Sequence, residues 1–182
     1  MREFQNNIVV LLTKVGMPNA SFKVDIRKQD PQFLNQSGLT EMKFLFSANK
    51  GFAPLEIREV ASGGELSRLM LCIKSLLADS AALPTMLFDE IDTGISGEVA
   101  YKVGDIMKTL SRNHQIIAIT HLPQIARTAD LHLYIYKEAN SGKTLTRIKE
   151  LKGEDRILEI AKMLSGEKPT NAALANAREM VA

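Results

Sequence analysis

The segment TMLFDEIDTGISGEVA, residues 85–100, decides the fold of this 182-residue chain. It begins as a short apolar strand over 85–89 and passes through a turn into an expected helix from about 96 to 111. A second apolar strand, QIIAIT at 115–120, follows that helix. Strand, helix and strand at these lengths form a right-handed βαβ unit with two parallel strands. The sequence therefore predicts an α/β fold with a mostly parallel sheet flanked by helices.

Helices and strands are also expected on both sides of this unit. Apolar residues at helical spacing mark 4–15, which is either a core helix or, over residues 1–16, the end of a longer coiled coil. No linker-like segment divides the chain, so residues 1–182 are expected to form a single domain. The other expected elements are strands at 22–26 and 42–46, a helix at 64–78, a C-terminal β-hairpin of 131–137 with 143–151 around Asn140-Ser141-Gly142, and closing helices at 154–164 and 170–181.

Composition excludes several classes of protein. A hydrophobic fraction of 45% and a mean hydropathy of -0.05 describe an ordinary globular chain. No apolar run approaches the roughly 20 residues that span a bilayer, and MREFQNN does not resemble a secretory signal. No membrane partner is therefore expected. The lone Cys72 cannot form an internal disulfide, which favours a reducing cytoplasm. A net charge of +2 is too small to indicate nucleic-acid binding by itself.

Two carboxylates follow the first strand of the βαβ unit. Asp89 and Glu90 should lie at the C-terminal edge of the parallel strands, where α/β sheets place ligands. An aspartate there can hold Mg²⁺, and the neighbouring glutamate can act as a general base toward water. A purely structural acidic turn remains an alternative. Asp92, in the turn that follows, is either a turn residue or part of the same site.

His121 follows the second strand. If the two strands are neighbours, its imidazole approaches the same sheet edge as Asp89 and Glu90. It could then hydrogen-bond a terminal phosphate or the attacking water. A satisfied structural histidine remains the alternative.

A second candidate site lies at the start of the helix expected from about residue 64. Ser62, Gly63 and Gly64 offer a hydroxyl, two uncrowded backbone amides and a helix N-terminus, which together favour a phosphate anion. Ser62 and Glu65 also fit a capping box, which would need no ligand. Both interpretations remain open at this point.

The order of these three segments resembles a known family. A Ser-Gly-Gly-Glu helix start, a strand ending in Asp-Glu and a strand ending in Thr-His resemble the C-terminal lobe of the ABC-type ATPase head. Within that class, ASGGELSR, LFDEIDTGISG and ITHLPQIA are similar to the RecN family of bacterial DNA repair proteins, relatives of the SMC proteins. The resemblance covers about residues 16–182, including ILEIAKMLSGE and TNAALANAREMV. Ala61 and Glu65 depart from the usual LSGGQ wording, which argues against a transporter subunit.

The resemblance implies a role for each candidate residue. Glu90 would be a catalytic base, His121 the switch histidine and Asp89 the metal ligand of a Walker B pair. The remaining candidates would contact ATP, as the signature loop and the D-loop, and are Ser62, Gly63, Gly64, Glu65 and Asp92.

The resemblance also implies cofactors and partners. These are ATP and Mg²⁺, DNA, and a second copy joined through ATP-sandwiched heads in a cytoplasmic, nucleoid-associated protein. The chain contains no G-x-x-x-x-G-K-[ST] phosphate loop. We therefore expect the C-terminal half of a split head, an ATPase in the complete protein but inactive as an isolated chain. The alternatives are an ABC ATPase of another branch, in SMC-like chromosome organisation or in a transporter, and a non-catalytic dimerisation or DNA-association module.

Overall fold

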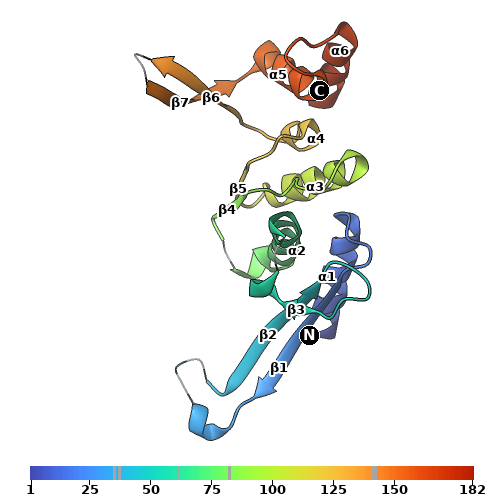
Figure 1. The fold of residues 1–182 in the computed structure, drawn as a ribbon, viewed down its shortest axis with the longest axis vertical. Helices are drawn as coiled ribbons and strands as arrows, with labels where there is room; N and C mark the ends of the chain where they lie inside the picture. The colour runs from blue at the N-terminus through green and yellow to red at the C-terminus, as the bar shows by residue number, and fades with distance from the viewer. Residues whose placement is uncertain (35, 37, 61, 82, 141–142) are drawn as a thin grey trace.

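The computed structural model describes the 182 residues except 35, 37, 61, 82 and 141–142, and its elements are stacked along one long axis (Figure 1). The β1–β2 hairpin lies at one end, α2 and α3 lie in the middle, and α5 and α6 lie at the other end. The helices are α1 (Arg2–Lys14), α2 (Gly63–Ala81), α3 (Gly97–Leu110), α4 (Pro123–Ala126), α5 (Gly153–Ser165) and α6 (Asn171–Val181), with short 3-10 turns η1 (Pro31–Phe33) and η2 (Ile57–Glu59). The strands are β1 (Ser21–Lys28), β2 (Thr40–Ser47), β3 (Leu55–Glu56), β4 (Thr85–Phe88), β5 (Gln115–Ala118), β6 (His132–Asn140) and β7 (Lys143–Leu151).

The expected βαβ unit is present. Strands β4 and β5 are parallel neighbours, with Thr85 opposite Gln115 and Phe88 opposite Ala118. The Ile119 backbone N–H extends the pairing by donating to the Phe88 carbonyl at 3.0 Å. Helix α3 connects the two strands. The residues that follow β4 and β5 therefore lie at one edge of the sheet.

The predicted share of parallel strands was too high. Among the described strands, β4 and β5 form the parallel pair, whereas β1, β2 and β3 form one antiparallel sheet and β6 and β7 another. Parallel neighbours need a crossover of about a dozen residues or more, which α3 supplies for β4 and β5. The segment from β6 to β7 is only two residues long, so those strands fold back on each other, and β1 and β2 also pair antiparallel. The α/β class and the C-terminal hairpin are confirmed, although Ser141 and Gly142 lie outside the described residues.

Helix α1 packs into the main core. Ile8, Leu12 and Val15 are fully buried, and the helix contacts α2 and β1. Gly16 ends the helix with a φ of 85°, a conformation that glycine adopts without strain. This packing agrees with the interpretation of residues 4–15 as a core helix. The alternative, that residues 1–16 end a longer coiled coil, stays a prediction.

Among the residues that the structure describes, buried apolar side chains form two clusters. The larger one lies between α1, α2, α3 and the strands β1, β2 and β4, and the smaller one joins α4 to α5 and α6 through Ala126, Ile160, Ala161 and Ala177. The single-domain assignment for residues 1–182 stays a prediction.

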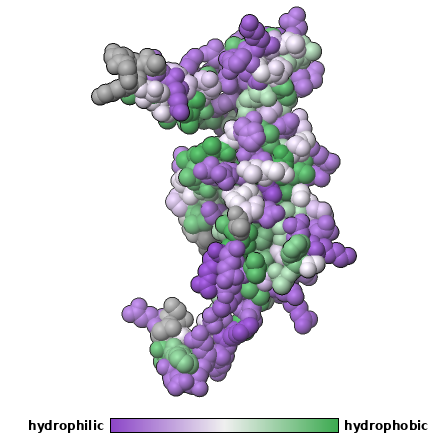
Figure 2. Space-filling view, viewed as in Figure 1, coloured by the Kyte–Doolittle hydropathy of each residue, from purple (hydrophilic) through white to green (hydrophobic). Residues whose placement is uncertain are grey.

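The two faces of the parallel pair differ. Met86 and Phe88 are buried in the main core. On β4 and β5, Leu87, Ile117 and the adjoining Ile119 are 58%, 45% and 50% exposed. Figure 2 shows hydrophobic surface over the middle of the molecule. Helices usually cover both faces of a parallel sheet, so this outer face is a surface that another layer would stabilise.

None of the described helices combines the length and apolar character needed to cross a membrane.

Candidate functional site: an acidic turn beside a helix N-terminus

The acidic turn, residues 89–93, begins directly after β4. The Asp89 and Glu90 side chains are exposed, and the Glu90 backbone N–H donates to Asp89 Oδ1 at 3.0 Å. Glu90 has a φ of 55°, which lies in the left-handed region that few non-glycine residues adopt. The two carboxylates predicted as metal ligand and base therefore stand together at the sheet edge, in a turn with local backbone strain.

Asp92 is the buried centre of the site. Its side chain is 4% exposed, and its Oδ2 accepts hydrogen bonds from Thr120 Oγ1 at 2.6 Å and from the His121 backbone N–H at 2.8 Å. His121 Nδ1 lies 3.0 Å from the same oxygen, while the His121 side chain is 74% exposed. Asp92 thus ties the turn after β4 to the segment after β5. In this conformation it orients His121 and does not face solvent.

The N-terminus of α2 packs against the acidic turn. Ser62 Oγ accepts a hydrogen bond from the Glu65 backbone N–H at 3.4 Å, which is one half of the expected capping box. A side chain at Gly63 would place its Cβ 2.5 Å from Glu90 Oε2, and one at Gly64 would meet the Thr93 carbonyl at 2.7 Å. The two glycines therefore allow the turn to approach the helix. Ala61, the first residue of the ASGGE segment that resembles the LSGGQ loop, lies outside the described residues.

Arg68 was not among the site residues predicted from the sequence, yet the structure places it at the acidic turn. It is 5% exposed, and its Nη1 donates to the Thr93 carbonyl at 2.6 Å. Burial lowers the pKa of its guanidinium below the usual range, and the Glu65 carboxylate opposes that shift. A signal was available in retrospect. Arg68 lies four residues after Gly64, on the helix face that Gly64 presents to the turn.

The structure thus brings together every described candidate residue. Asp89, Glu90 and Asp92 lie in the turn after β4, and His121 is held by Asp92. Ser62 to Glu65 form the helix start against which this turn packs. Their individual roles in binding and catalysis stay predictions.

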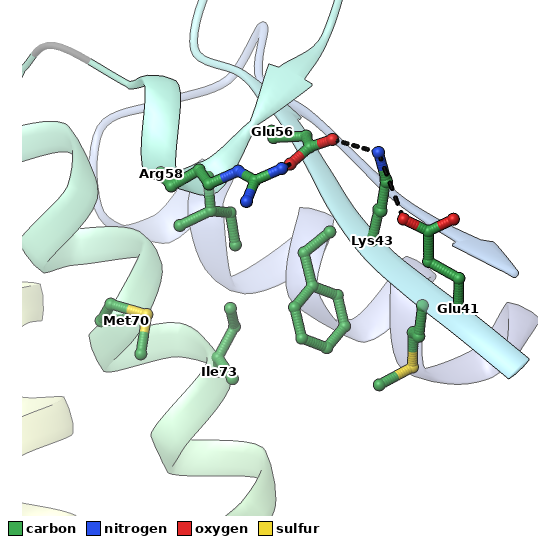
Figure 3. Close-up of a pocket in the computed structure, with 9 residues that line it drawn as sticks. Glu41, Lys43, Glu56, Arg58, Met70 and Ile73 are labelled. Atoms are coloured by element: carbon green, nitrogen blue, oxygen red, sulfur yellow. Dashed lines mark ion pairs between the residues drawn. The ribbon is translucent and has the colours of Figure 1, made fainter. Parts of the chain in front are cut away.

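A cavity of about 420 Å³ lies elsewhere, between β2, η2 and α2 (Figure 3). Met70 and Ile73 of α2 form part of its apolar wall. Its charged rim is internally paired. Lys43 Nζ lies 2.6 Å from Glu56 Oε1, and Arg58 pairs with the other oxygen of Glu56. The Glu56 hydrogen bond raises the pKa of Lys43, so this lysine stays protonated near neutral pH.

Neither a multi-ligand metal cluster nor a phosphate loop accompanies the turn. Within the part of the chain that the structure describes, no group of three or more His, Cys, Asp or Glu residues is placed to hold a metal ion. The triplet Gly142-Lys143-Thr144 matches the end of a phosphate loop, but Lys137 stands where that motif has its first glycine. Lys143 and Thr144 begin strand β7 and do not enter a helix.

Comparison with known proteins identifies relatives along nearly the whole chain. No protein-family model matches. The chain is 42% identical over 168 residues to the DNA repair protein RecN of Bacillus subtilis, a match that covers 92% of this chain and 29% of that protein. The resemblance to RecN proteins is confirmed. This RecN-like chain spans less than one third of the length of the curated relative it matches.

Solved structures confirm the fold of the RecN-like chain. It matches the Smc head domain with a coiled coil and joint from Pyrococcus yayanosii with a TM-score of 0.58 and 24% identity, over 92% of this chain and 29% of that one. A chain from work on ATP-driven dimerization and DNA-stimulated activation of SMC ATPases matches with a TM-score of 0.52 and 20% identity. That match covers 92% of this chain and 97% of the other. The fold is therefore that of a segment of an SMC-type ATPase head.

Proposed function

We propose that this RecN-like chain is the C-terminal part of an ATP-binding and ATP-hydrolysing head in a protein of DNA double-strand-break repair and recombination. The head would act as a pair, in which ATP joins two copies and hydrolysis separates them. The sequence similarity to RecN and the fold similarity to SMC heads support this proposal.

One observation carries the proposal. The exposed Glu90 carboxylate and the exposed His121 imidazole are presented by turns at one edge of the parallel pair, and Asp92 holds the two turns together. A carboxylate base needs a fixed position near the water from which it takes a proton, and a neighbouring imidazole can hydrogen-bond the phosphate that water attacks. We assign the base to Glu90 and the phosphate contact to His121.

The residues also fit the two cofactors. Mg²⁺ is commonly bound by one or two carboxylates together with substrate phosphates, and the exposed Asp89 offers such a carboxylate. When bound, Mg²⁺ would supply positive charge that neutralises phosphate oxygens. Ser62 and the backbone amides of Gly63 and Gly64 at the α2 N-terminus form an anion-binding end for ATP phosphates. Glu65 and Asp92 would orient this loop and the adjacent turn.

The chain needs further parts to complete such a site. We propose that the rest of the complete protein supplies a phosphate loop and a layer over Leu87, Ile117 and Ile119, which the outer face leaves exposed. DNA would be the partner of the complete protein, which would work at the cytoplasmic nucleoid. The isolated chain would bind ATP weakly and hydrolyse none, since phosphoryl transfer depends on positioning and charge stabilisation.

The first test uses the complete protein and steady-state ATP hydrolysis. Glu90→Gln should reduce kcat by about 10²-fold or more, because it removes the base, and should leave ATP binding and the ATP-bound dimer intact. His121→Ala should lower kcat with a smaller effect on binding. Hydrolysis by the isolated chain that Glu90→Gln abolishes would contradict the split-head proposal.

The second test asks whether the α2 start acts on a partner's nucleotide. Ser62→Arg should leave ATP binding to a single head intact and prevent dimerisation. Two inactive complete proteins are then mixed, one carrying Ser62→Arg and one mutated in the lysine of its phosphate loop. If the sites act between chains, one of the two composite sites in the mixed dimer is intact and activity returns. An inactive mixture, despite demonstrated mixed dimers, would place Ser62 in its own chain's site or require both sites to act together.

A further inference from the structure

Two consecutive residues of α2 hold the two ends of the acidic turn. Ser67 Oγ donates to the Asp89 carbonyl at 2.8 Å, and Arg68 Nη1 donates to the Thr93 carbonyl at 2.6 Å. Both bonds end on backbone oxygens, so they set the path of the main chain between Asp89 and Thr93. Glu90 and Asp92 lie inside that span.

The burial of Arg68 needs an explanation. A guanidinium taken from water is costly unless its donors are used, and its Nε has no hydrogen-bond partner among the residues that the structure describes. Gly64, one helical turn before Arg68, leaves room for the guanidinium beside the Thr93 carbonyl. A Cβ at Gly64 would stand 3.3 Å from Arg68 Nη1 and 2.7 Å from the Thr93 carbonyl. The helix start, the guanidinium and the turn therefore share one tightly packed contact.

We propose that Ser67 and Arg68 are positioning residues that fix the acidic turn to the N-terminal end of α2. This inference deepens the proposed function, on which its catalytic consequence rests. Neither side chain reaches a reacting atom. Ser67 sets where the turn leaves β4, and Arg68 sets where it returns toward α3.

The contact extends from α2 to the histidine. Arg68 holds Thr93, and the neighbouring Asp92 holds Thr120 and His121 through its carboxylate. A movement of the α2 start would therefore displace both Glu90 and His121. If the α2 start binds a partner's nucleotide, this contact would transmit the resulting movement to Glu90 and His121.

Hydrogen exchange of the chain itself tests the contact without any activity. The reporters are the amides of Thr93, Ile95 and His121, which donate to Glu90, Asp92 and the Asp92 side chain. Arg68→Met should raise their exchange rates by about tenfold, since it removes a hydrogen bond from a charged donor. Arg68→Lys, which keeps a donor, should give an intermediate change. Ser67→Ala should give a smaller change confined to the Asp89 end of the turn.

Two matched variants separate positioning from general stability. Arg156→Met removes a half-buried arginine that likewise donates to backbone carbonyls, those of Arg127 and Ala129, and should leave the three reporter amides unchanged. Ser75→Ala removes a serine bond to a carbonyl on the same helix and should also leave them unchanged. Equal acceleration at the reporters and at the Leu174 amide of α6 in Arg68→Met would overturn the proposal. So would no acceleration at either place.

Kinetics of the complete protein test the catalytic consequence. Arg68→Met should lower kcat by about tenfold or more and change the KM for ATP by less than about twofold, because misplaced groups act on the transition state more than on binding. Arg68→Lys should recover part of kcat. Unchanged kcat in an active complete protein would overturn the positioning role. A wild-type protein without ATPase activity would instead remove the proposed function, while the exchange data would still decide the contact.

Discussion

The inner and outer faces of the β4–β5 pair have the same kind of residue and opposite surroundings. Met86 and Phe88 point inward and are buried by the main core, while Leu87 and Ile117 point outward and are half-exposed. Successive side chains of a strand point to opposite faces, so the sequence places apolar side chains on both faces of the pair. The apolar residues of a strand indicate which of its faces are suited to burial. Only the tertiary structure shows which of those faces other elements bury.

The largest expected effect on the free energy of unfolding comes from removing a buried side chain of the inner face. Phe88→Ala should lower the free energy of unfolding by about 3–5 kcal/mol, because it removes a buried ring and leaves a cavity. Urea unfolding of the chain, followed by circular dichroism, measures the loss. A loss below about 1 kcal/mol would mean that the inner face is not packed as described.

The next effect is pH-dependent and comes from Cys72, in the same core cluster as Phe88. Burial raises the pKa of its thiol from 9.0 to about 12, with Arg68 opposing the shift. The thiol therefore loses its proton at a lower pH in the unfolded chain than in the folded one. Its contribution to the free energy of unfolding is complete below pH 9.0 and is lost as the pH rises toward 12. We expect a loss of about 2 kcal/mol near pH 10.5, measured by urea unfolding.

Cys72→Ala is the control for this dependence. Its unfolding free energy should fall less steeply between pH 9 and 11, since other titrating groups are the same in both proteins. Parallel curves for the two proteins would contradict the buried thiol.

A smaller effect is expected from charging the outer face. The exposed Leu87, Ile117 and Ile119 should cause the chain to self-associate, because contiguous apolar surface favours contact. Leu87→Lys should weaken that association by about tenfold, which corresponds to the burial of one leucine side chain at partial cover. Sedimentation velocity at several concentrations measures the change. A chain that is monomeric at high concentration would show that the outer face tolerates water.

The smallest effect should come from Leu87→Ala in the monomeric chain. The side chain has few neighbours to lose, so the free energy of unfolding should change by less than about 0.5 kcal/mol. Measured beside Phe88→Ala at low protein concentration, it gives the difference between the two faces directly. Similar losses for the two variants would contradict the comparison. In the complete protein, a larger loss for Leu87→Ala would indicate that another layer covers it.

Much of the fold was predictable because its signals are local. The βαβ unit, the C-terminal hairpin, the strands expected at 22–26 and 42–46 and the closing helices appear close to their expected bounds. The short elements β3, η2 and α4 were not predicted, since two to four residues carry too little periodicity. The share of parallel strands was overestimated because the antiparallel pairing of β1, β2 and β3 was not predicted, and that pairing depends on contacts between segments.

The candidate site was predictable as residues and only partly as geometry. Asp89, Glu90 and His121 were expected at one sheet edge because the strands before them are parallel neighbours. Spacing from Gly64 indicates the helix face of Arg68, but it could not show the burial of Asp92 or Arg68, because both side chains face groups that come from distant segments. Thr120 and His121 lie 28 and 29 residues after Asp92, and Thr93 lies 25 after Arg68.

The sequence by itself determined the local elements, the order of the three motifs and the resemblance to RecN. These follow from side-chain periodicity, turn chemistry and residue identity, which act over a few positions. Only the tertiary structure decided that the α2 start packs on the acidic turn, that Asp92 holds His121, and that one face of β4 and β5 is covered. Those features arise from close packing and hydrogen bonds between distant segments, where a glycine such as Gly64 matters for the atom it allows to approach.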